Sequence, residues 1–342
     1  RLSPLRRLVV FYYKRIIGKD GFAGNPNGRS EAENQNMYDI IVVGSGPAGL
    51  TAALYALRAG KRVLVLEKSA FGGQVTYSPK IENYPGIAQM SGNEFADRLL
   101  DQVLAMGADV NLETVTGVRE EGAVKTVVTE EGTYACRSVI LATGVKHRLL
   151  GVPGEQDFIG NGISFCAVCD GAFYKDKTVT VIGGGNSALQ EAVLLSESCK
   201  QVIVVQNLPK FTGEARLVEI LAAKDNVTFV LGTVVDEILS EKGECKGIRV
   251  RPDGKDAQES RTIACDGMFV AIGLVPANDA FANVAPLNSF GYFEVGEDCL
   301  TGTPGIYVAG DCRSKRVRQI TTASADGAVA ALAACRYLDG EL

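Results

Sequence analysis

Runs of consecutive apolar residues recur along the chain and are separated by glycine-rich turns and helical patterns. Residues 39–44 read DIIVVG, a run typical of a strand buried on both faces. Apolar residues at helical spacing follow from Leu50 to Leu57. A second apolar run over 62–66 predicts another strand, which ends at Glu67. The pattern therefore predicts a strand, a turn, a helix and a second strand, in that order.

The turn after the first strand is a complete G-x-G-x-x-G motif. It consists of Gly44, Ser45, Gly46, Pro47, Ala48 and Gly49. Between a strand and a helix, this motif predicts a dinucleotide site, because its glycines permit a tight turn, approach of the pyrophosphate and close packing of the helix. The helix N-terminus offers free N–H groups to the phosphates. Glu67, 23 residues after Gly44, is expected to accept a hydrogen bond from an adenosine ribose hydroxyl.

The same order of elements begins again 139 residues later. An apolar run covers 178–182, a helical pattern covers 189–196 and a second run covers 201–205. The intervening turn fits G-x-G-x-x-A and contains Gly183, Gly185, Asn186, Ser187 and Ala188. Gln206 stands where the first unit has Glu67. Two such units predict two dinucleotides, with a glycine turn kept only for packing as the alternative for the second.

Two further apolar runs end in glycine turns, and a helix closes the chain. Residues 138–144 read SVILATG, residues 305–311 read GIYVAGD, and an Ala-rich amphipathic pattern covers 323–338. The whole pattern predicts an α/β fold with two Rossmann-like dinucleotide-binding domains.

Composition narrows the classes of function. The chain has 342 residues, 46% of them hydrophobic, which suits roughly two globular domains. No uncharged run approaches the roughly 18 residues of a membrane span, so no membrane partner is expected. A formal net charge of −5 provides no basic surface for nucleic acid. The single histidine, His147, excludes a His-rich metal site and gives little support to a Ser-His-Asp hydrolase; no metal site is predicted.

Residues 1–36 differ in charge from the rest of the chain. They carry seven Lys or Arg and three Asp or Glu, whereas 37–342 carry 28 and 37. Their apolar stretch, 8–13, is six residues long, and the apolar region of a signal peptide runs to about 7–15. We interpret this segment as an extension, disordered or encoded upstream. A targeting peptide and a basic interaction arm are the alternatives.

The nine cysteines do not suit a secreted disulfide framework, because their number is odd and most are isolated. The isolated ones are expected to be small buried residues in a reducing cytoplasm. They are Cys136, Cys199, Cys245, Cys265, Cys299, Cys312 and Cys335. The other two, Cys166 and Cys169, form a C-x-x-C motif between the two glycine turns.

A C-x-x-C motif can be half of a zinc site, a pair of inert thiols or a redox dithiol. Zinc would need a second pair of ligands, and the chain has neither a second C-x-x-C nor a second histidine. A redox dithiol is favoured, because two thiols at this spacing can close a disulfide and exchange it through a mixed disulfide. Asp170, next to Cys169, is placed to exchange a proton with a thiolate; a turn acid before Gly171 is the alternative.

In this order, the motifs resemble those of low-molecular-weight thioredoxin reductases, which depend on FAD. The resemblance covers about nine-tenths of the chain, from Met37 to Leu342. Its motifs are GSGPAG at 44–49, Gly72-Gly73-Gln74, Asn83-Tyr84-Pro85-Gly86, ATG at 142–144, CAVCDG at 166–171, GGGNSA at 183–188, Gly310-Asp311 and Arg318-Gln319-Ile320.

The resemblance implies an organisation for the whole chain. Residues 37–147 and 276–342 would form a discontinuous FAD-binding domain, and 148–275 an inserted NAD(P)H-type domain with the C-x-x-C. The chain would cross between them near Lys146 and Val275. Subunits would pair as homodimers. FAD would contact the 44–49 turn, Glu67, Lys68, Gly72, Gly73, Gln74, Asn83, Thr143, Gly144, Gly310, Asp311, Arg318, Gln319 and Ile320.

The resemblance also implies a relay of electrons. A hydride would pass from the nicotinamide to the flavin, and the electrons would then pass to the Cys166–Cys169 disulfide. Cys169 would face the flavin, Cys166 would attack the protein substrate, and Asp170 would be the general acid. Rotation of one domain against the other would present the dithiol first to the flavin and then to thioredoxin.

The chain departs from the family after the second strand of the second unit. NADPH-using members have His-Arg-Arg there and a further Arg, which bind the 2′-phosphate. This chain has Gln206-Asn207-Leu208 and then Thr212, with Lys210 and Arg216 as the nearby cations. It also lacks the acid that selects NADH. We therefore expect weak discrimination for NADPH, use of NADH, or a donor that is not a nicotinamide.

Four functions remain open from the sequence. The first is reduction of thioredoxin or a glutaredoxin-like protein with NADPH or NADH. The second is a ferredoxin-driven flavin disulfide reductase, and the third is a dithiol oxidase that passes electrons to oxygen. The fourth, a non-catalytic flavin-binding sensor or scaffold, is disfavoured by the intact C-x-x-C-D-G.

Overall fold

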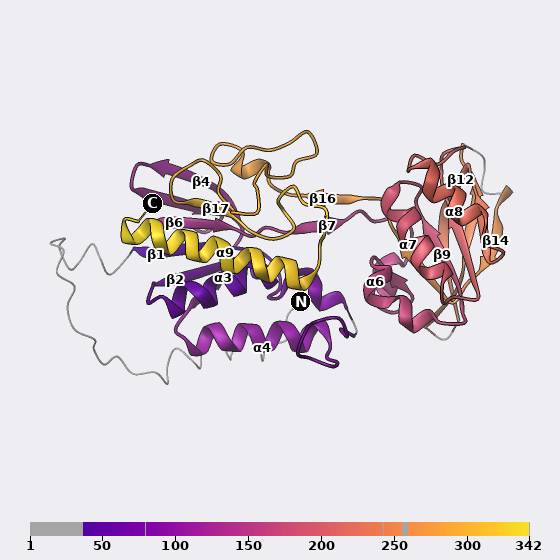
Figure 1. The fold of residues 1–342 in the computed structure, drawn as a ribbon, viewed down its shortest axis with the longest axis horizontal. Helices are drawn as coiled ribbons and strands as arrows, with labels where there is room; N and C mark the ends of the chain where they lie inside the picture. Colours follow the sequence, from indigo (N-terminus) through magenta and orange to yellow (C-terminus); the bar gives the residue numbers. More distant parts are fainter. Residues whose placement is uncertain (1–36, 79, 242, 255–258, 342) are drawn as a thin grey trace. The chain divides into compact units, whose positions relative to one another are not determined.

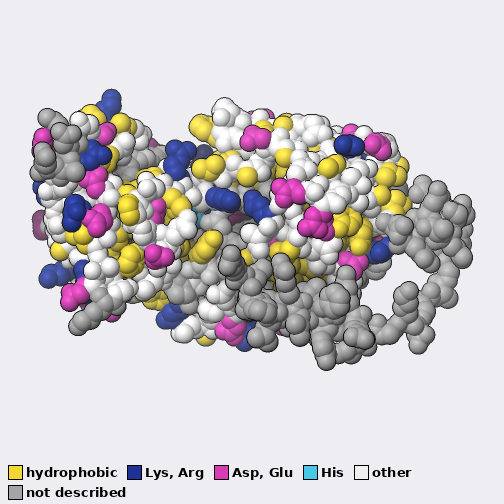
Figure 2. Space-filling view, turned by 180° about the vertical axis from the view of Figure 1, so that it is seen from behind, with side chains coloured by type: hydrophobic (Ala, Val, Ile, Leu, Met, Phe, Trp, Pro, Cys, Tyr) yellow, Lys and Arg dark blue, Asp and Glu magenta, His cyan; other side chains and the backbone are white. Residues whose placement is uncertain are grey.

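The computed structural model describes residues 37–78, 80–241, 243–254 and 259–341 (Figure 1). The interpretations of residues 1–36 as an extension, a targeting peptide or an interaction arm lie outside these ranges. Among the described helices, none is both long enough and apolar enough to cross a membrane. Lys and Arg side chains are interspersed with Asp and Glu on the face shown in Figure 2.

A seven-stranded sheet contains the first predicted unit. Its order is β3 (Asp109–Leu112), β2 (Val63–Glu67), β1 (Tyr38–Val43), β6 (Thr133–Leu141), β5 (Val124–Thr129) and β4 (Val115–Glu121), with β17 (Ile306–Val308) also paired to β6. The pairs among β3, β2, β1, β6 and β17 are parallel, whereas β4, β5 and β6 pair antiparallel. The two predicted strands at 39–44 and 62–66 are therefore present and adjacent.

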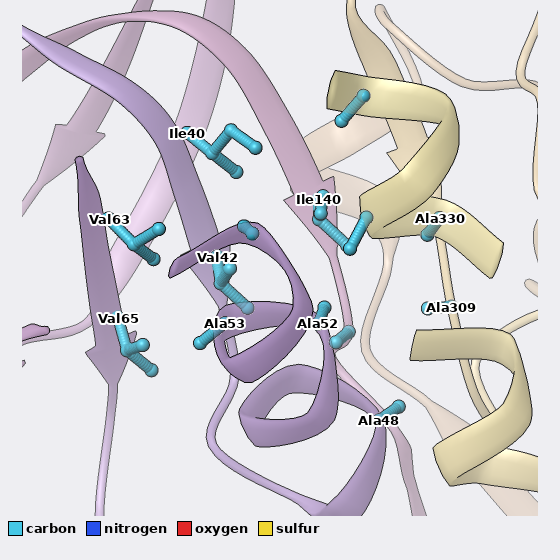
Figure 3. Packing of buried hydrophobic residues seen from close by; sticks show 14 of the residues in the cluster. Ile40, Val42, Ala48, Ala52, Ala53, Val63, Val65, Ile140, Ala309 and Ala330 are labelled. Atoms are coloured by element: carbon cyan, nitrogen blue, oxygen red, sulfur yellow. The ribbon is translucent and has the colours of Figure 1, made fainter. Parts of the chain in front are cut away.

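Helices α3 (Pro47–Arg58), α4 (Gly92–Ala105) and α9 (Ile320–Asp339) contribute to the core of this part. Figure 3 shows Ala48, Ala52 and Ala53 of α3 among Ile40 and Val42 of β1, with Ala330 of α9 nearby. Small side chains allow the two helices to approach closely. A Cβ atom at Gly327 of α9 would lie only 2.1 Å from the carbonyl oxygen of Ala48, so glycine is required at this crossing.

A five-stranded parallel sheet contains the second predicted unit. Its order is β11 (Val227–Val230), β10 (Gln201–Val205), β9 (Thr178–Ile182), β15 (Gly267–Val270) and β8 (Ile163–Ser164). Helices α7 (Asn186–Ser196) and α8 (Ala215–Ala222) belong to this part, as does an antiparallel sheet of β12 (Thr233–Glu241), β13 (Glu244–Pro252) and β14 (Arg261–Ala264). Its apolar core includes Val179, Val181 and Phe269 from the strands and Leu189 from α7.

A two-stranded antiparallel ribbon is formed by β7 (Val145–His147) and β16 (Leu274–Pro276). Lys146 and Val275, the two expected crossing points, are direct partners in this ribbon. The domain boundaries themselves stay a prediction. The remaining short helices are η1 (Gly73–Tyr77), α5 (Glu155–Phe158), α6 (Ala167–Asp170), η2 (Gly171–Tyr174) and η4 (Asp279–Phe281).

Candidate active site

The first glycine turn connects β1 to α3 and cannot accept larger residues. Gly44 has a φ of 104°, and a Cβ atom there would lie 2.3 Å from the carbonyl oxygen of Ala142. A Cβ atom at Gly49 would lie 1.9 Å from the oxygen of Gly44. Gly46 precedes the helix and no side chain caps it, which leaves N–H groups of the first turn available to an anion. The turn therefore has the geometry that a dinucleotide pyrophosphate requires.

Glu67 at the end of β2 is tied to this turn. Its Oε2 atom accepts hydrogen bonds from Ser45 N (2.9 Å) and Ser45 Oγ (2.8 Å), and its Oε1 atom accepts one from Ser69 N (3.1 Å). Gly72 N donates to the carbonyl oxygen of Ser45 (3.0 Å), so the segment after Glu67 is held against the turn. Oε1 also accepts a longer bond from Ser69 Oγ (3.4 Å), and this is the contact that a ribose hydroxyl could replace.

Asp311 follows β17 and has a buried oxygen without a hydrogen bond. Its Oδ1 atom has no hydrogen bond, although Lys315 Nζ lies 3.8 Å away. Burial raises the pKa of Asp311 to about 6, while the charges of Lys315 and Arg318 oppose this rise. Buried polar atoms are almost always hydrogen-bonded, so a bound ligand with a hydroxyl donor would satisfy this one.

The predicted flavin contacts gather at one edge of the large sheet. The 44–49 turn, Glu67, Thr143 and Asp311 come after β1, β2, β6 and β17, whose parallel strands end at the same edge. Open α/β sheets bind ligands at this edge. Asn83 Nδ2 donates to Gln319 Oε1 (3.2 Å), and Arg318 Nε donates to the carbonyl oxygen of Asp311 (3.3 Å). Thr143 differs, because its hydroxyl already donates to Asn278 Oδ1 (2.7 Å). The residues present fit a flavin dinucleotide.

The second glycine turn repeats the main features of the first. Gly183 has a φ of 132°, and a Cβ atom there would lie 2.4 Å from the carbonyl oxygen of Ala271. Gly183 N donates to Val205 O (2.9 Å), as Gly44 N donates to Leu66 O (2.8 Å). Helix α7 begins after Gly185 without a side-chain cap. This geometry supports a second dinucleotide over a turn kept only for packing.

The position equivalent to Glu67 is neutral in the second unit. Gln206 is 6% exposed, and a Cβ atom at Gly184 would meet its Cδ and Nε2 atoms at 2.5 Å, so its side chain covers the turn. The amides of Thr212 and Gly213 both donate to Gly184 O at 2.9 Å. Leu208 is exposed beside them. The segment that follows β10 is therefore folded onto the turn. It presents the amide of Gln206 and the apolar side chain of Leu208 where a 2′-phosphate would need cations.

Cys166 and Cys169 are joined in a disulfide at the start of α6. Cys169 N donates to Cys166 Sγ at 3.2 Å. A donated hydrogen bond favours the charged form of a sulfur, so it would stabilise a thiolate at Cys166 after reduction. Val168, between the cysteines, is 62% exposed, which leaves the outer side of the motif open to a protein substrate. The other seven cysteines are free and buried, as predicted.

Asp170 lies beneath the motif and is linked to it through Ser164. Cys166 N donates to Ser164 Oγ (3.1 Å), and Ser164 Oγ donates to Asp170 Oδ2 (2.6 Å). The other oxygen, Oδ1, is buried without a partner. Burial raises the pKa of Asp170, and the hydrogen bond from Ser164 opposes the rise. Asp170 is therefore a half-buried carboxyl suited to carrying a proton, and not an exposed turn acid.

Two polar residues of this region belong to no sequence motif and were not predicted. Ser164 stands in β8, and nothing in its spacing distinguishes it from any other serine in a strand. Glu191 stands within the helical pattern of α7. A carboxylate among apolar residues is the one feature of the sequence that could have indicated a functional role for it. Its Oε2 atom is buried and has no hydrogen-bond partner.

Two glycine turns of one geometry and a redox disulfide define a dinucleotide-binding disulfide oxidoreductase. The family described as pyridine nucleotide-disulphide oxidoreductase matches residues 38–327, and the chain belongs to it. The family binds a flavin and a pyridine nucleotide. The predicted α/β fold class and enzyme class are confirmed.

Three similar proteins are thioredoxin reductases that match over nearly their whole length. That of Treponema pallidum is 40% identical over 303 residues, which is 88% of this chain and 97% of the relative. That of Listeria monocytogenes is 37% identical and covers 90% of this chain and 96% of the relative. The solved thioredoxin reductase from Streptococcus pyogenes is 37% identical with a TM-score of 0.84, over 89% of this chain and 99% of that one. The resemblance to low-molecular-weight thioredoxin reductases is thus confirmed.

Proposed function

We propose that this enzyme reduces the disulfide of thioredoxin, or of a similar small protein, with electrons from NADPH or NADH. The disulfide between Cys166 and Cys169, with the buried Asp170 beneath it, is the observation that supports this most directly. The names of the relatives agree, and they disfavour a ferredoxin-driven reductase, a dithiol oxidase or a scaffold.

FAD is the proposed flavin, and it would be held by the edge of the large sheet. The first glycine turn would bind the pyrophosphate, Glu67 the adenosine ribose, and Asp311 a hydroxyl donor through Oδ1, which has no hydrogen bond. The chemistry that bound FAD would supply is acceptance of a hydride and transfer of its two electrons to the disulfide. The protein contributes the rigid turn, the paired carboxylate of Glu67 and the buried acceptor.

The cysteines would then carry out two exchanges with the substrate. Cys166 Sγ would bond to one substrate sulfur, breaking the substrate S–S bond, and the leaving sulfur would take a proton. Cys169 Sγ would then bond to Cys166 Sγ, releasing the second substrate sulfur, which also takes a proton. The enzyme ends as the disulfide and the substrate as the dithiol. Asp170 is the proposed proton donor for this exchange.

The proposed nucleotide site discriminates weakly against NADH. Replacing Asn207 and Leu208 together with arginine should supply the missing contacts, because guanidinium groups bind phosphate by charge-assisted bonds. We expect kcat/KM for NADPH to rise roughly tenfold, on the scale of one such contact, and kcat/KM for NADH to change little. Steady-state kinetics with both nucleotides measure this.

As a control, the double variant Glu219→Gln and Lys224→Gln, outside this turn, should leave the ratio of kcat/KM for NADPH to kcat/KM for NADH unchanged. An unchanged NADPH value in the arginine variant would refute this account of the turn.

Two further points of the organisation are proposals. We propose that the subunits pair as homodimers, which light scattering of the purified chain would test. We also propose a reducing compartment, the cytoplasm, because the seven free cysteines are buried without disulfides.

An anaerobic titration tests the proposed function. NADPH and then NADH are added to the purified flavoprotein while the flavin absorbance is followed, and oxidised thioredoxin is added afterwards. Bleaching by a nucleotide and recovery with thioredoxin is the expected result. Bleaching only by dithionite or reduced ferredoxin would contradict the role of the second glycine turn. Bleaching by a nucleotide without recovery would contradict thioredoxin as the substrate.

A further inference from the structure

Glu191 is a buried carboxyl for which the proposed reaction has no role so far. It stands on α7, which packs against α6, the short helix that carries Cys169 and Asp170. Its Oε2 atom is buried and has no hydrogen-bond partner, and the same is true of Asp170 Oδ1. Two unpaired carboxyl oxygens therefore lie in neighbouring helices beneath the disulfide.

The surroundings of Glu191 favour its neutral form. Burial raises its pKa to about 8; a backbone hydrogen bond from Ala167 opposes the rise, and the charge of Asp170 adds to it. Ala167 lies between the two cysteines and is itself buried, so Glu191 contacts the backbone of the C-x-x-C segment. The pKa of Asp170 is raised as well, mainly by burial.

The other elements around the two carboxyls supply no compensating cation that acts on Glu191. Strands β9 and β10, which pack on α7, contain no charged residue. Helix α8 also packs on α7, but its Arg216 and Glu219 are not among the groups that shift the pKa of Glu191. On η2, Tyr174 has a raised pKa, through burial first and the charge of Asp170 second. Among the described residues, Asp170 is thus the ionisable group that acts on Glu191.

Two neighbouring carboxyls in a buried site do not ionise together, because the second negative charge is repelled by the first. We propose that Glu191 and Asp170 form a carboxyl pair that keeps one proton beside the disulfide at neutral pH, with Glu191 as the positioning residue that retains this proton for transfer through Asp170. The catalytic role of this carboxyl pair rests on the proposed function.

The pair would complete the proton balance of the exchange step. Two protons leave the enzyme with the two substrate sulfurs when the dithiol becomes the disulfide. If Cys166 reacts as the thiolate, the thiol of Cys169 supplies one proton and Asp170 supplies the other. Glu191 keeps that second proton on the pair at pH values where an isolated aspartate, with an ordinary pKa of about 3.9, would have lost it.

Glu191→Gln tests the pair, because it keeps the size and the acceptor for Ala167 but removes the titrating proton. Infrared difference spectra of the full chain across pH should show a protonated carboxyl that disappears near pH 8 in the wild type, whereas in this variant the last protonated carboxyl should disappear at lower pH. The matched control is Glu197→Gln, an exposed carboxylate next to the end of α7 that pairs with Lys224. The control should keep the carboxyl band. Glu191→Asp, which retains a carboxyl, should also keep a band, and it replaces the amide variant if that variant does not fold.

The pH profile supplies the functional measurement. In Glu191→Gln the alkaline limb of thioredoxin reduction should move to lower pH by about one unit, which lowers the rate at pH 8 roughly tenfold and leaves the rate at pH 6 nearly unchanged. A uniform loss across pH would indicate a structural role and overturn the proposal, as would a band that persists near pH 8 in Glu191→Gln. If wild type does not reduce thioredoxin, the proposed function fails, while the infrared band still decides whether the pair exists.

Discussion

Cys169→Ser is expected to abolish turnover of thioredoxin while leaving the flavin bound. Without its sulfur the enzyme cannot reform the Cys166–Cys169 disulfide, so the mixed disulfide between Cys166 and the substrate is not resolved. The loss should reach about 10³-fold or more, the scale on which removal of a reacting nucleophile acts. The measurement is thioredoxin reduction under saturating nucleotide, with the flavin absorbance per protein recorded in parallel.

A pair of variants separates the roles of the two sulfurs. Reduced Cys169→Ser should accumulate a covalent complex with oxidised thioredoxin on a non-reducing gel, because Cys166 still attacks. Cys166→Ser should form much less of it. Cys199→Ser, a buried free cysteine at the end of α7, should turn over normally. Turnover above a tenth of wild type in Cys169→Ser, or equal trapping by the two variants, would contradict these assignments.

The parts of the fold that the sequence predicted well are those with strong local signals. Strands β9 and β10 occupy the predicted ranges 178–182 and 201–205, because each consists mostly of β-branched residues and is buried beyond its first position. Helix α9 begins at Ile320, three residues before the predicted start, because Gln319 and Thr322 form a capping box there.

Other strands were not predicted, because they lack a long apolar run. Strands β4, β5, β12, β13 and β14 contain exposed or half-buried positions along their length, and each includes at least one charged residue. These strands pair antiparallel with strands that are close in sequence. Their residue patterns resemble those of polar loops. An edge position and a half-buried face weaken the apolar signal on which the sequence pattern depends.

The candidate site shows the same division. The glycine turns and the C-x-x-C were evident from spacing alone, because the chemistry needs those residue types at fixed separations. The significance of Glu191 could not be predicted, because it depends on α6 packing against α7 and on two carboxyl oxygens remaining unpaired. Ser164 likewise acquires its role only when β8 places it between Cys166 N and Asp170.

A buried ion cluster beside the proposed flavin site should dominate the stability of this part of the protein. Arg313, with a side chain 2% exposed, donates two hydrogen bonds to Asp326, at 2.8 and 2.9 Å. Lys315 and the amide of Gly310 also donate to Asp326, at 2.9 and 3.0 Å. Gly310 precedes Asp311, so the cluster also fixes the end of β17.

Asp326→Asn is expected to lower the free energy of unfolding by about 3–5 kcal/mol, because it leaves two buried cations without their shared anion. Urea unfolding of the full chain measures this. The control is Asp339→Asn, whose exposed carboxylate pairs with Lys61 at the surface and should cost less than about 1 kcal/mol. Equal effects of the two variants would show that the buried cluster does not stabilise the fold.

The pH dependence of this difference gives an independent check on the charge of Asp326. Burial alone would raise its pKa, but hydrogen bonds from Arg313 and Lys315 outweigh burial and lower the pKa below 3.8. A carboxyl with a lowered folded-state pKa contributes stability above its unfolded pKa of about 3.9 and loses that contribution as the pH falls through the folded value. The gap between wild type and Asp326→Asn should therefore stay constant from pH 8 to about pH 5 and shrink below about pH 4. A gap that is the same at pH 3 and pH 7 would mean that asparagine disturbs packing, and that the charge of Asp326 contributes little.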